Sequence, residues 1–330
     1  MSNKILLAPI FQNARFDTEQ RRSGLKELAE LANLEMEPTE LTEDDADGVV
    51  GVIASSALVH PSFYQAADKL RVISRWGVGY ENTNYEIATQ HGVFVTIAPE
   101  HMVTVAEYTI AQWMATLKRV YTLNRLSHGG DFAIIRTYEA GGSTLGLYGF
   151  GRIGQAVARR AKPLLGNEGR LLVYDVRSDI QELATEYGAI VVDDPMVLFR
   201  ESDTVSLHVA GDGTIVDYDC LCAMKPHSSL INPSRGNLVD DQAVNRAICE
   251  DRLYYYVVDD PVNGPRKIHK DNPRIICTNH NAGITLESAI RLDLRTFGQV
   301  TDAIQGRKPA HILNPDVLDH PQVKALLKTE

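Results

Sequence analysis

A glycine-rich segment at residues 149–154, GFGRIG, has the spacing G-x-G-x-x-G. It follows an apolar stretch at residues 145–148 and precedes a helical pattern, which is the context that a dinucleotide-binding loop requires. The first glycine permits a tight turn, the second lets the backbone approach a pyrophosphate, and the third lets helix and strand pack closely. The positive end of the following helix, which begins near Arg152 and Ile153, would then face the phosphates.

An acidic residue, Asp175, ends the next apolar run at residues 171–174. A carboxylate at the end of that strand can accept hydrogen bonds from the ribose hydroxyls of NAD, and it repels the 2′-phosphate of NADP. The neighbouring Arg177 is the one hint of NADP. The sequence therefore predicts an NAD site, and its residues are Gly149, Gly151, Arg152, Ile153, Gly154 and Asp175.

Short β-branched runs alternate with helical patterns along nearly the whole chain, which is typical of a parallel, doubly wound sheet. In the first part we expect strands at residues 4–8, 34–36, 49–54, 70–74 and 94–97, with helices at 19–33, 61–69 and 85–91. A longer helix at 101–125 leads to a break at Gly141-Gly142. After it we expect strands at 144–148, 170–174, 204–207, 229–232, 255–258 and 275–278, and a final long helix at 285–305. The pattern predicts two α/β domains with a ligand cleft between them.

The composition excludes several classes of function. The 33 Lys and Arg against 43 Asp and Glu give a net charge of −10, which argues against a general nucleic-acid or membrane-surface binder. No uncharged apolar run approaches the ~20 residues of a membrane helix, and no secretory leader is apparent. The four cysteines lack the spacing of a zinc site, so we expect reduced packing residues and no metal. We expect a soluble, cytoplasmic protein.

Five further segments resemble, in order, motifs of the D-isomer-specific 2-hydroxyacid dehydrogenase family, whose relatives include glyoxylate/hydroxypyruvate reductases and phosphoglycerate dehydrogenases. They are residues 74–82 (SRWGVGYEN), 105–107 (VAE), 202–208 (SDTVSLH), 224–236 (MKPHSSLINPSRG) and 278–280 (TNH). The resemblance covers nearly the whole chain. It implies an NAD-dependent enzyme that interconverts a 2-oxo acid and a D-2-hydroxy acid, and a homodimer with contacts through the cofactor domain.

The resemblance assigns the catalytic roles to Arg235 and His280. A guanidinium can form forked hydrogen bonds to the carboxylate and carbonyl oxygens of the substrate and stabilise growing negative charge. An imidazole exchanges a proton near neutral pH, so His280 would protonate the carbonyl oxygen during reduction and recover the proton in reverse. By the same resemblance, Asp259 would accept a hydrogen bond from the nicotinamide amide.

The segment around Gly77 resembles the substrate loop of the family. The backbone N–H groups of Val78 and Gly79 would bind the substrate carboxylate. Side chains that either line the pocket or pack in the core are Arg75, Trp76, Tyr80, His101 and Met102.

One position departs from the family pattern. The family places a glutamate five residues after the aspartate that corresponds to Asp259, and its carboxylate pairs with the catalytic histidine. Here that position is Gly264. Either His280 works unassisted, or another carboxylate (Asp260, Asp271 or Glu287) replaces the glutamate, or the chain is an NAD(H)-binding sensor or corepressor-like protein. The presence of both Arg235 and His280 favours an enzyme.

The resemblance also implies the architecture. We expect a flavodoxin-like substrate-binding domain at residues 1–100 and 308–330, and an NAD-binding Rossmann domain at 101–307 inserted into it. The helices at 101–125 and 285–305 would form the hinges. The sequence does not indicate which 2-oxo acid is used.

Overall fold

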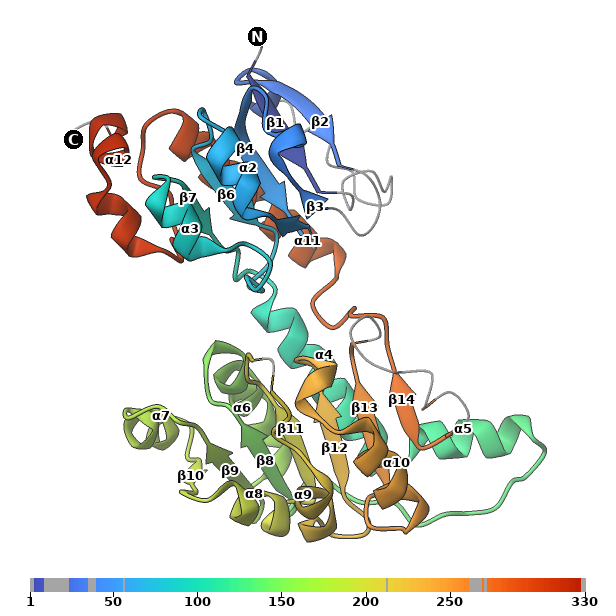
Figure 1. The fold of residues 1–330 in the computed structure, drawn as a ribbon. Helices are drawn as coiled ribbons and strands as arrows, with labels where there is room; N and C mark the ends of the chain where they lie inside the picture. The colour runs from blue at the N-terminus through green and yellow to red at the C-terminus, as the bar shows by residue number, and fades with distance from the viewer. Residues whose placement is uncertain are drawn as a thin grey trace. The chain divides into compact units, whose positions relative to one another are not determined.

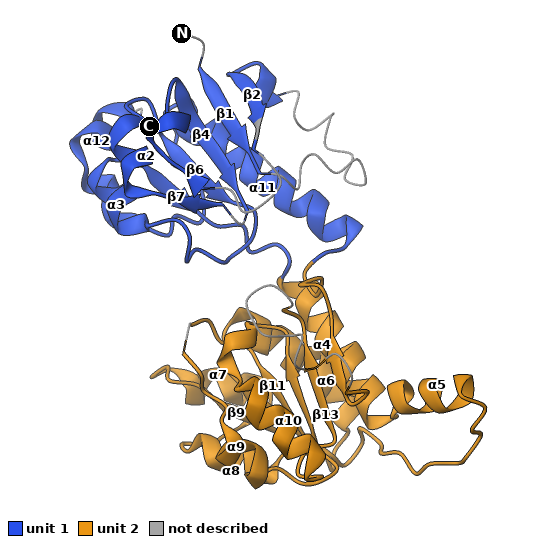
Figure 2. Cartoon of the chain, turned by 45° about the vertical axis from the view of Figure 1, so that its right-hand side comes forward, with its two compact units in different colours: residues 1–101, 284–330 blue, residues 102–283 orange. Residues whose placement is uncertain are grey.

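The computed structural model describes residues 3–8, 24–34, 40–55, 57–211, 213–260, 269 and 272–327. The chain divides into two compact units, which we name unit 1 (residues 1–101 and 284–330) and unit 2 (residues 102–283) (Figure 2). Each unit is built on its own parallel sheet with helices on both faces (Figure 1). The prediction of two α/β, doubly wound parallel-sheet domains is confirmed.

The sheet of unit 2 has seven strands in the order β10-β9-β8-β11-β12-β13-β14, all parallel. Counted along the chain this is 3-2-1-4-5-6-7, which extends the Rossmann order. The strands are β8 (Thr144–Tyr148), β9 (Arg170–Tyr174), β10 (Ile190–Val191), β11 (Thr204–Leu207), β12 (Ser229–Asn232), β13 (Tyr255–Val258) and β14 (Ile275–Cys277).

Two apolar cores cover the faces of this sheet, because its strands are buried on both sides. Helices α4 (Met102–Leu117), α6 (Arg152–Leu165) and α7 (Ile180–Glu186) contribute to one core. Helices α8 (Pro195–Glu201), α9 (Tyr218–Ala223) and α10 (Asp241–Cys249) contribute to the other. Because both faces of the sheet are packed, the residues that directly follow its strands are held in fixed positions at the carboxyl edge.

The sheet of unit 1 has the parallel order β2-β1-β4-β6-β7, which is the flavodoxin-like order 2-1-3-4-5. Its strands are β1 (Lys4–Leu7), β2 (Glu30–Asn33), β4 (Val49–Ala54), β6 (Val72–Arg75) and β7 (Phe94–Thr96). Its helices are α2 (Pro61–Ala66), α3 (Tyr85–Gln90), α11 (Leu286–Ile304) and α12 (Pro321–Leu326). A separate pair joins β3 (Glu40–Leu41) to β5 (Leu58–Val59).

Three expectations from the sequence need correction. The helix expected at 19–33 and the strand at 34–36 are wrong at residues 30–34: β2 begins at Glu30, because pairing with β1 overrides local helix propensity. The helix expected at 101–125 breaks at Arg119, whose φ of 49° is left-handed, and continues as α5 (Val120–His128). The guanidinium of Arg119 stacks 4.0 Å above the ring of Tyr254 at this break.

The third correction concerns the boundary expected at residue 307. Helix α11 belongs to unit 1, since it packs on β4, β6 and β7. Its buried side chains Leu292, Phe297 and Val300 are part of the unit 1 core. Residues 284–307 were therefore wrongly expected in the cofactor domain.

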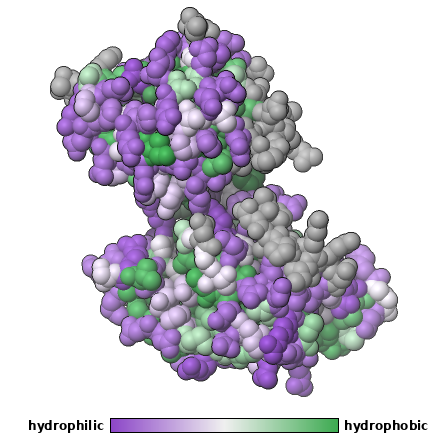
Figure 3. Space-filling model, viewed as in Figure 1, coloured by the Kyte–Doolittle hydropathy of each residue, from purple (hydrophilic) through white to green (hydrophobic). Residues whose placement is uncertain are grey.

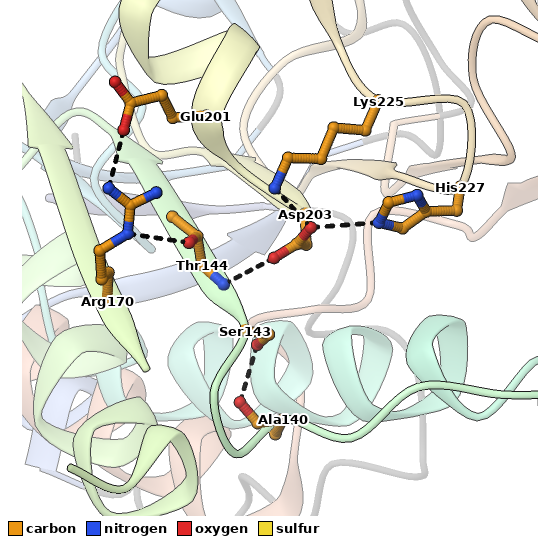
Figure 4. A network of polar contacts seen from close by, with 8 residues as sticks. All are labelled: Ala140, Ser143, Thr144, Arg170, Glu201, Asp203, Lys225 and His227. Atoms are coloured by element: carbon orange, nitrogen blue, oxygen red, sulfur yellow. Dashed lines mark hydrogen bonds and ion pairs between the residues drawn. The ribbon is translucent and has the colours of Figure 1, made fainter. Parts of the chain in front are cut away.

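At the amino edge of the unit 2 sheet, Asp203 holds the starts of two strands together (Figure 4). Its carboxylate accepts hydrogen bonds from the Thr144 N–H (2.8 Å), from Lys225 Nζ (2.7 Å) and from His227 Nε2 (3.1 Å). Burial alone would raise the pKa of Asp203, but these three donors hold it below its ordinary value. Asp203 belongs to the motif at 202–208, and Lys225 and His227 belong to the motif at 224–236. Two motifs that resemble the family thus contact each other here, and the contact stabilises the fold.

The described part of the chain contains no helix that is both long and apolar enough to cross a membrane. In Figure 3 the visible surface of both units is mainly hydrophilic, with small hydrophobic areas between. No disulfide bond joins any two of the four cysteines, all of which lie among the described residues. The expectation that they are packing residues is wrong for Cys249 and Cys277, which are exposed.

Candidate active site

The glycine-rich loop joins β8 to α6, and the surroundings of its three glycines differ. At Gly149 φ is +97°, and a Cβ atom would lie 2.4 Å from the carbonyl oxygen of His208. At Gly154 a Cβ atom would lie 2.3 Å from the Gly149 oxygen. At Gly151, in contrast, a Cβ atom would meet nothing within 4 Å. The first and third glycines serve the chain's own packing, and the second borders open space, as a pyrophosphate site requires.

The amino end of α6 is free of a side-chain cap, because the N-cap residue is Gly151. The first N–H groups of a helix have no acceptor within the helix, and together with the helix dipole they favour an anion. Arg152 and Ile153 are the first two residues of this helix. These features fit the pyrophosphate of a dinucleotide.

Asp175 lies beside this loop at the end of β9. Its Oδ2 atom accepts a hydrogen bond from the Phe150 N–H (2.6 Å), and its Oδ1 atom accepts one from the Arg177 N–H (3.1 Å). The Arg177 side chain forms a forked ion pair with Asp179, with distances of 2.8 Å and 2.7 Å. The residue that hinted at NADP is thus paired with an acid, whereas Asp175 is held next to the loop.

We predict that NAD(H) binds at least about tenfold more tightly than NADP(H), roughly 1.4 kcal/mol, because a 2′-phosphate would face the Asp175 carboxylate. Isothermal titration calorimetry with NADH and NADPH measures the two affinities. Asp175→Asn, which removes only the charge of this side chain, should reduce the ratio of NADH affinity to NADPH affinity. Equal binding of the two cofactors by the unchanged chain would contradict this prediction and would identify Arg177 as the discriminating residue.

Arg235 follows β12 in a turn that its neighbours fix. The Asn232 side chain donates to the Arg235 carbonyl (2.8 Å) and accepts from the Ser234 N–H (3.1 Å). Ser234 Oγ donates to the Leu207 carbonyl at the end of β11 (2.8 Å). The N–H of Gly236 donates to Asp260 Oδ2 (2.7 Å), a carboxylate that is almost completely buried. These hydrogen bonds therefore hold the backbone in place on both sides of Arg235.

His280 lies in the loop between β14 and α11, with a left-handed φ of 57°. Its Nδ1 atom is 3.2 Å from the carbonyl oxygen of Asp259. A carbonyl oxygen only accepts hydrogen bonds, so Nδ1 carries the proton in the neutral ring and Nε2 remains the atom for proton exchange. The carboxylate of Asp259 is 2% exposed and accepts hydrogen bonds from the N–H groups of Asn281 (2.9 Å) and Ala282 (2.6 Å).

The structure brings most of the predicted residues to one edge of the unit 2 sheet. Gly149 and Asp175 follow β8 and β9, and Arg235, Asp259 and His280 follow β12, β13 and β14, three consecutive strands of the sheet. Parallel strands end at a common edge, and ligands of such sheets bind outside their carboxyl ends. Two adjacent aspartates at the end of β13 bind the segments that follow the two neighbouring strands. Asp260 accepts a hydrogen bond from the turn that contains Arg235, and Asp259 accepts hydrogen bonds from the loop that contains His280.

The predicted substrate residues lie in unit 1, except Met102, which is the first residue of α4 in unit 2. Arg75 Nε donates to the carbonyl of Gly79 (2.6 Å), so this side chain fixes the loop that contains Val78. Trp76 is buried in the unit 1 core, and its Nε1 atom donates to Asp293 (2.7 Å). Its contacts are those of a packing residue.

Two more of the side chains considered for the pocket border the same loop. The His101 ring lies near Gly77, where a Cβ atom would be 3.8 Å from its Cε1 atom. Tyr80 is exposed.

The missing glutamate position, Gly264, and Asp271 lie outside the described residues. Of the other carboxylates considered as substitutes, Asp260 directs its Oδ2 atom to Gly236, on the arginine side of β13. Glu287 is exposed in unit 1. In the described part of the chain, His280 Nδ1 contacts the neutral carbonyl of Asp259.

Two residues that contact this region, Tyr108 and Thr278, were assigned no functional role from the sequence, and their hydroxyl groups are 2.7 Å apart. They are 170 positions apart in the chain, so no local pattern connects them. Among the described side chains no group of three or more His, Cys, Asp or Glu residues is arranged to hold a metal ion.

Comparison with known proteins supports the same assignment. Residues 110–282 match the family profile described as "D-isomer specific 2-hydroxyacid dehydrogenase, NAD binding domain". A glyoxylate reductase of Korarchaeum cryptofilum is 31% identical over 292 residues, covering 83% of this chain and 84% of the relative. A D-3-phosphoglycerate dehydrogenase of Methanocaldococcus jannaschii is 29% identical over 306 residues, covering 88% of this chain and 57% of the relative.

Solved structures show the same fold. The crystal structure of a glyoxylate reductase from Paecilomyes thermophila superposes with a TM-score of 0.81 at 22% identity, covering 95% of this chain and 99% of that chain. The cofactor for which the glycine loop and Asp175 are suited is NAD. The chain belongs to the D-isomer-specific 2-hydroxyacid dehydrogenase family.

Proposed function

We propose that this chain interconverts a 2-oxo acid and a D-2-hydroxy acid with NAD(H). The observation that carries the proposal is the placement of Arg235 and His280 after β12 and β14, at the sheet edge that also bears the glycine loop. NAD(H), when bound, supplies or accepts the hydride. The chain itself must hold the substrate carboxylate, stabilise charge on the carbonyl oxygen and exchange one proton.

Arg235 is the group for the first two tasks. Its guanidinium can donate two parallel hydrogen bonds to the carboxylate and carbonyl oxygens of a 2-oxo acid. The same donors stabilise negative charge that grows on the carbonyl oxygen during reduction. Asn232 and Asp260 fix the backbone around Arg235, and its Nη1 atom donates to the Ser234 carbonyl (3.0 Å) in this structure.

His280 exchanges the proton. With Nδ1–H directed at the Asp259 carbonyl, the protonated ring presents Nε2–H to the substrate oxygen, and the neutral ring presents a lone pair for the reverse reaction. A carbonyl group orients the ring but adds no full negative charge. Among the described residues no carboxylate forms an ion pair with His280.

We further propose that the loop around Gly77 binds the substrate carboxylate through the N–H groups of Val78 and Gly79. Arg75 supports this assignment, because its hydrogen bond to the Gly79 carbonyl fixes the loop. His101, beside Gly77, is the side chain from which we expect an effect on substrate choice.

The test is a panel of 2-oxo acids, including glyoxylate and hydroxypyruvate, assayed for NADH consumption and for the configuration of the product. We expect turnover of at least one acid, with the D-hydroxy acid as product. Tight NADH binding with no turnover of any acid would contradict the enzyme and favour the sensor or corepressor-like alternative.

The homodimer predicted from the family resemblance has a suitable surface in unit 2. Helix α5 and the segment after it, residues 129–139, extend away from the sheet of this unit (Figure 2). Phe132 is 80% exposed and Ile134 101% exposed, and residues two apart in an extended chain lie on the same side. Apolar surface of this kind marks an interaction site, and a second copy of the chain is the partner we propose.

We predict that the double substitution Phe132→Asp and Ile134→Asp converts the dimer to a monomer, because two carboxylates would have to be buried in the contact. Analytical ultracentrifugation measures the mass. Ile190→Asp, at an exposed apolar residue of β10, is the matched control and should leave the dimer intact. A mass unaffected by the double substitution would place the contact elsewhere.

We also propose a cytoplasmic location. The four cysteines form no disulfide bond with one another, which fits a compartment that keeps thiols reduced. Cell fractionation with an antibody against the chain tests this assignment.

A further inference from the structure

Tyr108 on α4 and Thr278 after β14 belong to a chain of hydrogen bonds that ends at Asp259. The Tyr108 hydroxyl lies 2.7 Å from Thr278 Oγ1, which in turn donates to Asp259 Oδ1 over 2.5 Å. All three residues belong to unit 2. All three residues are at least partly shielded from solvent: Tyr108 and Thr278 are half-buried, and Asp259 is buried.

The direction of the protons follows from the chemistry of the groups. An ionised carboxylate only accepts, so the single hydroxyl proton of Thr278 points to Asp259. The Thr278 oxygen must then accept from the phenol of Tyr108. Burial, with a contribution from the charge of Asp259, raises the pKa of Tyr108 well above its usual range, so the phenol keeps this proton.

The far end of this network surrounds His280. The two carboxylate oxygens of Asp259 accept from Thr278, from the N–H of Asn281 and from the N–H of Ala282, on both sides of the histidine in the chain. The carbonyl of the same aspartate accepts from His280 Nδ1. One residue thus fixes both the loop and the ring, in a backbone conformation (φ 57°) that a non-glycine residue adopts only when its surroundings impose it.

We propose that Tyr108, Thr278 and Asp259 are positioning residues that hold the His280 ring with Nδ1–H on the Asp259 carbonyl and Nε2 available to the substrate. This inference rests on the proposed function, because it assigns to the network the task of orienting the acid–base group. The task matters here because His280 has a neutral carbonyl as its recorded Nδ1 contact, so its orientation depends on the loop. Proton transfer is sensitive to displacements well below 1 Å.

Tyr108→Phe tests the network with the least disturbance, since it removes one oxygen and keeps the ring. We expect kcat for 2-oxo acid reduction to fall about threefold to tenfold, the range for one net hydrogen bond, with NADH affinity unchanged. Thr278→Val should cause a larger fall, and Thr278→Ser, which keeps the hydroxyl, should restore the rate. The matched control is Tyr218→Phe on α9, which removes the same phenol oxygen from a hydroxyl that donates to Glu250.

A second readout does not depend on turnover. Nitrogen-15 NMR of histidine-labelled protein reports the tautomer of the neutral His280 ring, with the signal assigned by its loss in His280→Gln. We expect a single Nδ1–H tautomer in the unchanged chain and in Tyr218→Phe, and a mixture of tautomers in Thr278→Val. A purely structural role would lower the melting temperature without altering the tautomer.

The two readouts separate the possible failures. If Tyr108→Phe and Thr278→Val leave both kcat and the tautomer unchanged, or lower only the melting temperature, the positioning role is overturned. If the unchanged chain reduces no 2-oxo acid, the proposed function fails, while the tautomer still decides whether the network orients the ring.

Discussion

Arg235→Lys is expected to lower kcat/KM for the 2-oxo acid about 10²- to 10³-fold, while the affinity for NADH stays unchanged. The size is that of losing one preorganised donor to a developing oxyanion. Lysine keeps the positive charge but offers a point charge on a flexible stem, so it loses the planar pair of donors that holds carboxylate and carbonyl oxygens together. Steady-state kinetics with the preferred acid, and calorimetry with NADH, measure the two quantities.

The substitution is expected to leave the fold intact, because the contacts that fix this turn use the backbone. Asn232 binds the Arg235 carbonyl, and Asp260 binds the Gly236 N–H. The matched control is Arg246→Lys on α10, an exposed arginine paired with Glu250. Near-normal kcat/KM in Arg235→Lys would show that the arginine does not hold the substrate.

The dinucleotide site could be predicted from the sequence because its signals are local. A strand, three glycines and a helix succeed one another without interruption, and Asp175 ends the next strand of the same βαβ unit. The close approaches at Gly149 and Gly154 explain why those glycines are fixed. The same holds for most strands of the two large sheets, which are short, apolar and separated by helices, although β2, β10 and the pair β3 and β5 were not predicted.

The parts that the sequence could not indicate depend on contacts between distant segments. Helix α11 has the amphipathic pattern of any helix, and only its packing on β4 and β6 places it in unit 1. Likewise, β2 forms where a helix was expected because β1 offers a partner strand. A local sequence pattern indicates whether a segment forms a helix or a strand, whereas tertiary packing determines which elements lie next to it and can change its type.

Asp259 and Asp260 show this limit at the site itself. As a pair of acids followed by a proline after a strand, they also fit the composition of an exposed turn. In the structure both are buried, and their carboxylates bind loops on opposite sides of β13. Their roles follow from the strand order β12-β13-β14, which a linear sequence does not display.

The pH dependence of the two reaction directions is the second large expected effect. Reduction needs the imidazolium form of His280 and oxidation needs the neutral form. Imidazole side chains exchange this proton between about pH 5 and 8. The rate of reduction should therefore fall as pH rises through this interval, and the rate of oxidation should rise. Rates of both directions at saturating NAD(H), recorded from pH 5 to pH 9, measure the two slopes.

His280→Gln should lower both rates about 10²- to 10⁴-fold, the usual contribution of a general acid–base group, and should remove the opposing slopes. Gly264→Glu is the complementary variant. A carboxylate that pairs with the imidazolium favours the charged form, so this variant should sustain reduction to higher pH and delay the rise of oxidation. Suppose instead that reduction by the unchanged chain stays constant to about pH 8.5, two units above the ordinary imidazole pKa of about 6.5. A carboxylate would then already assist His280, and Asp260→Asn, Asp271→Asn and Glu287→Gln would identify it by restoring the fall.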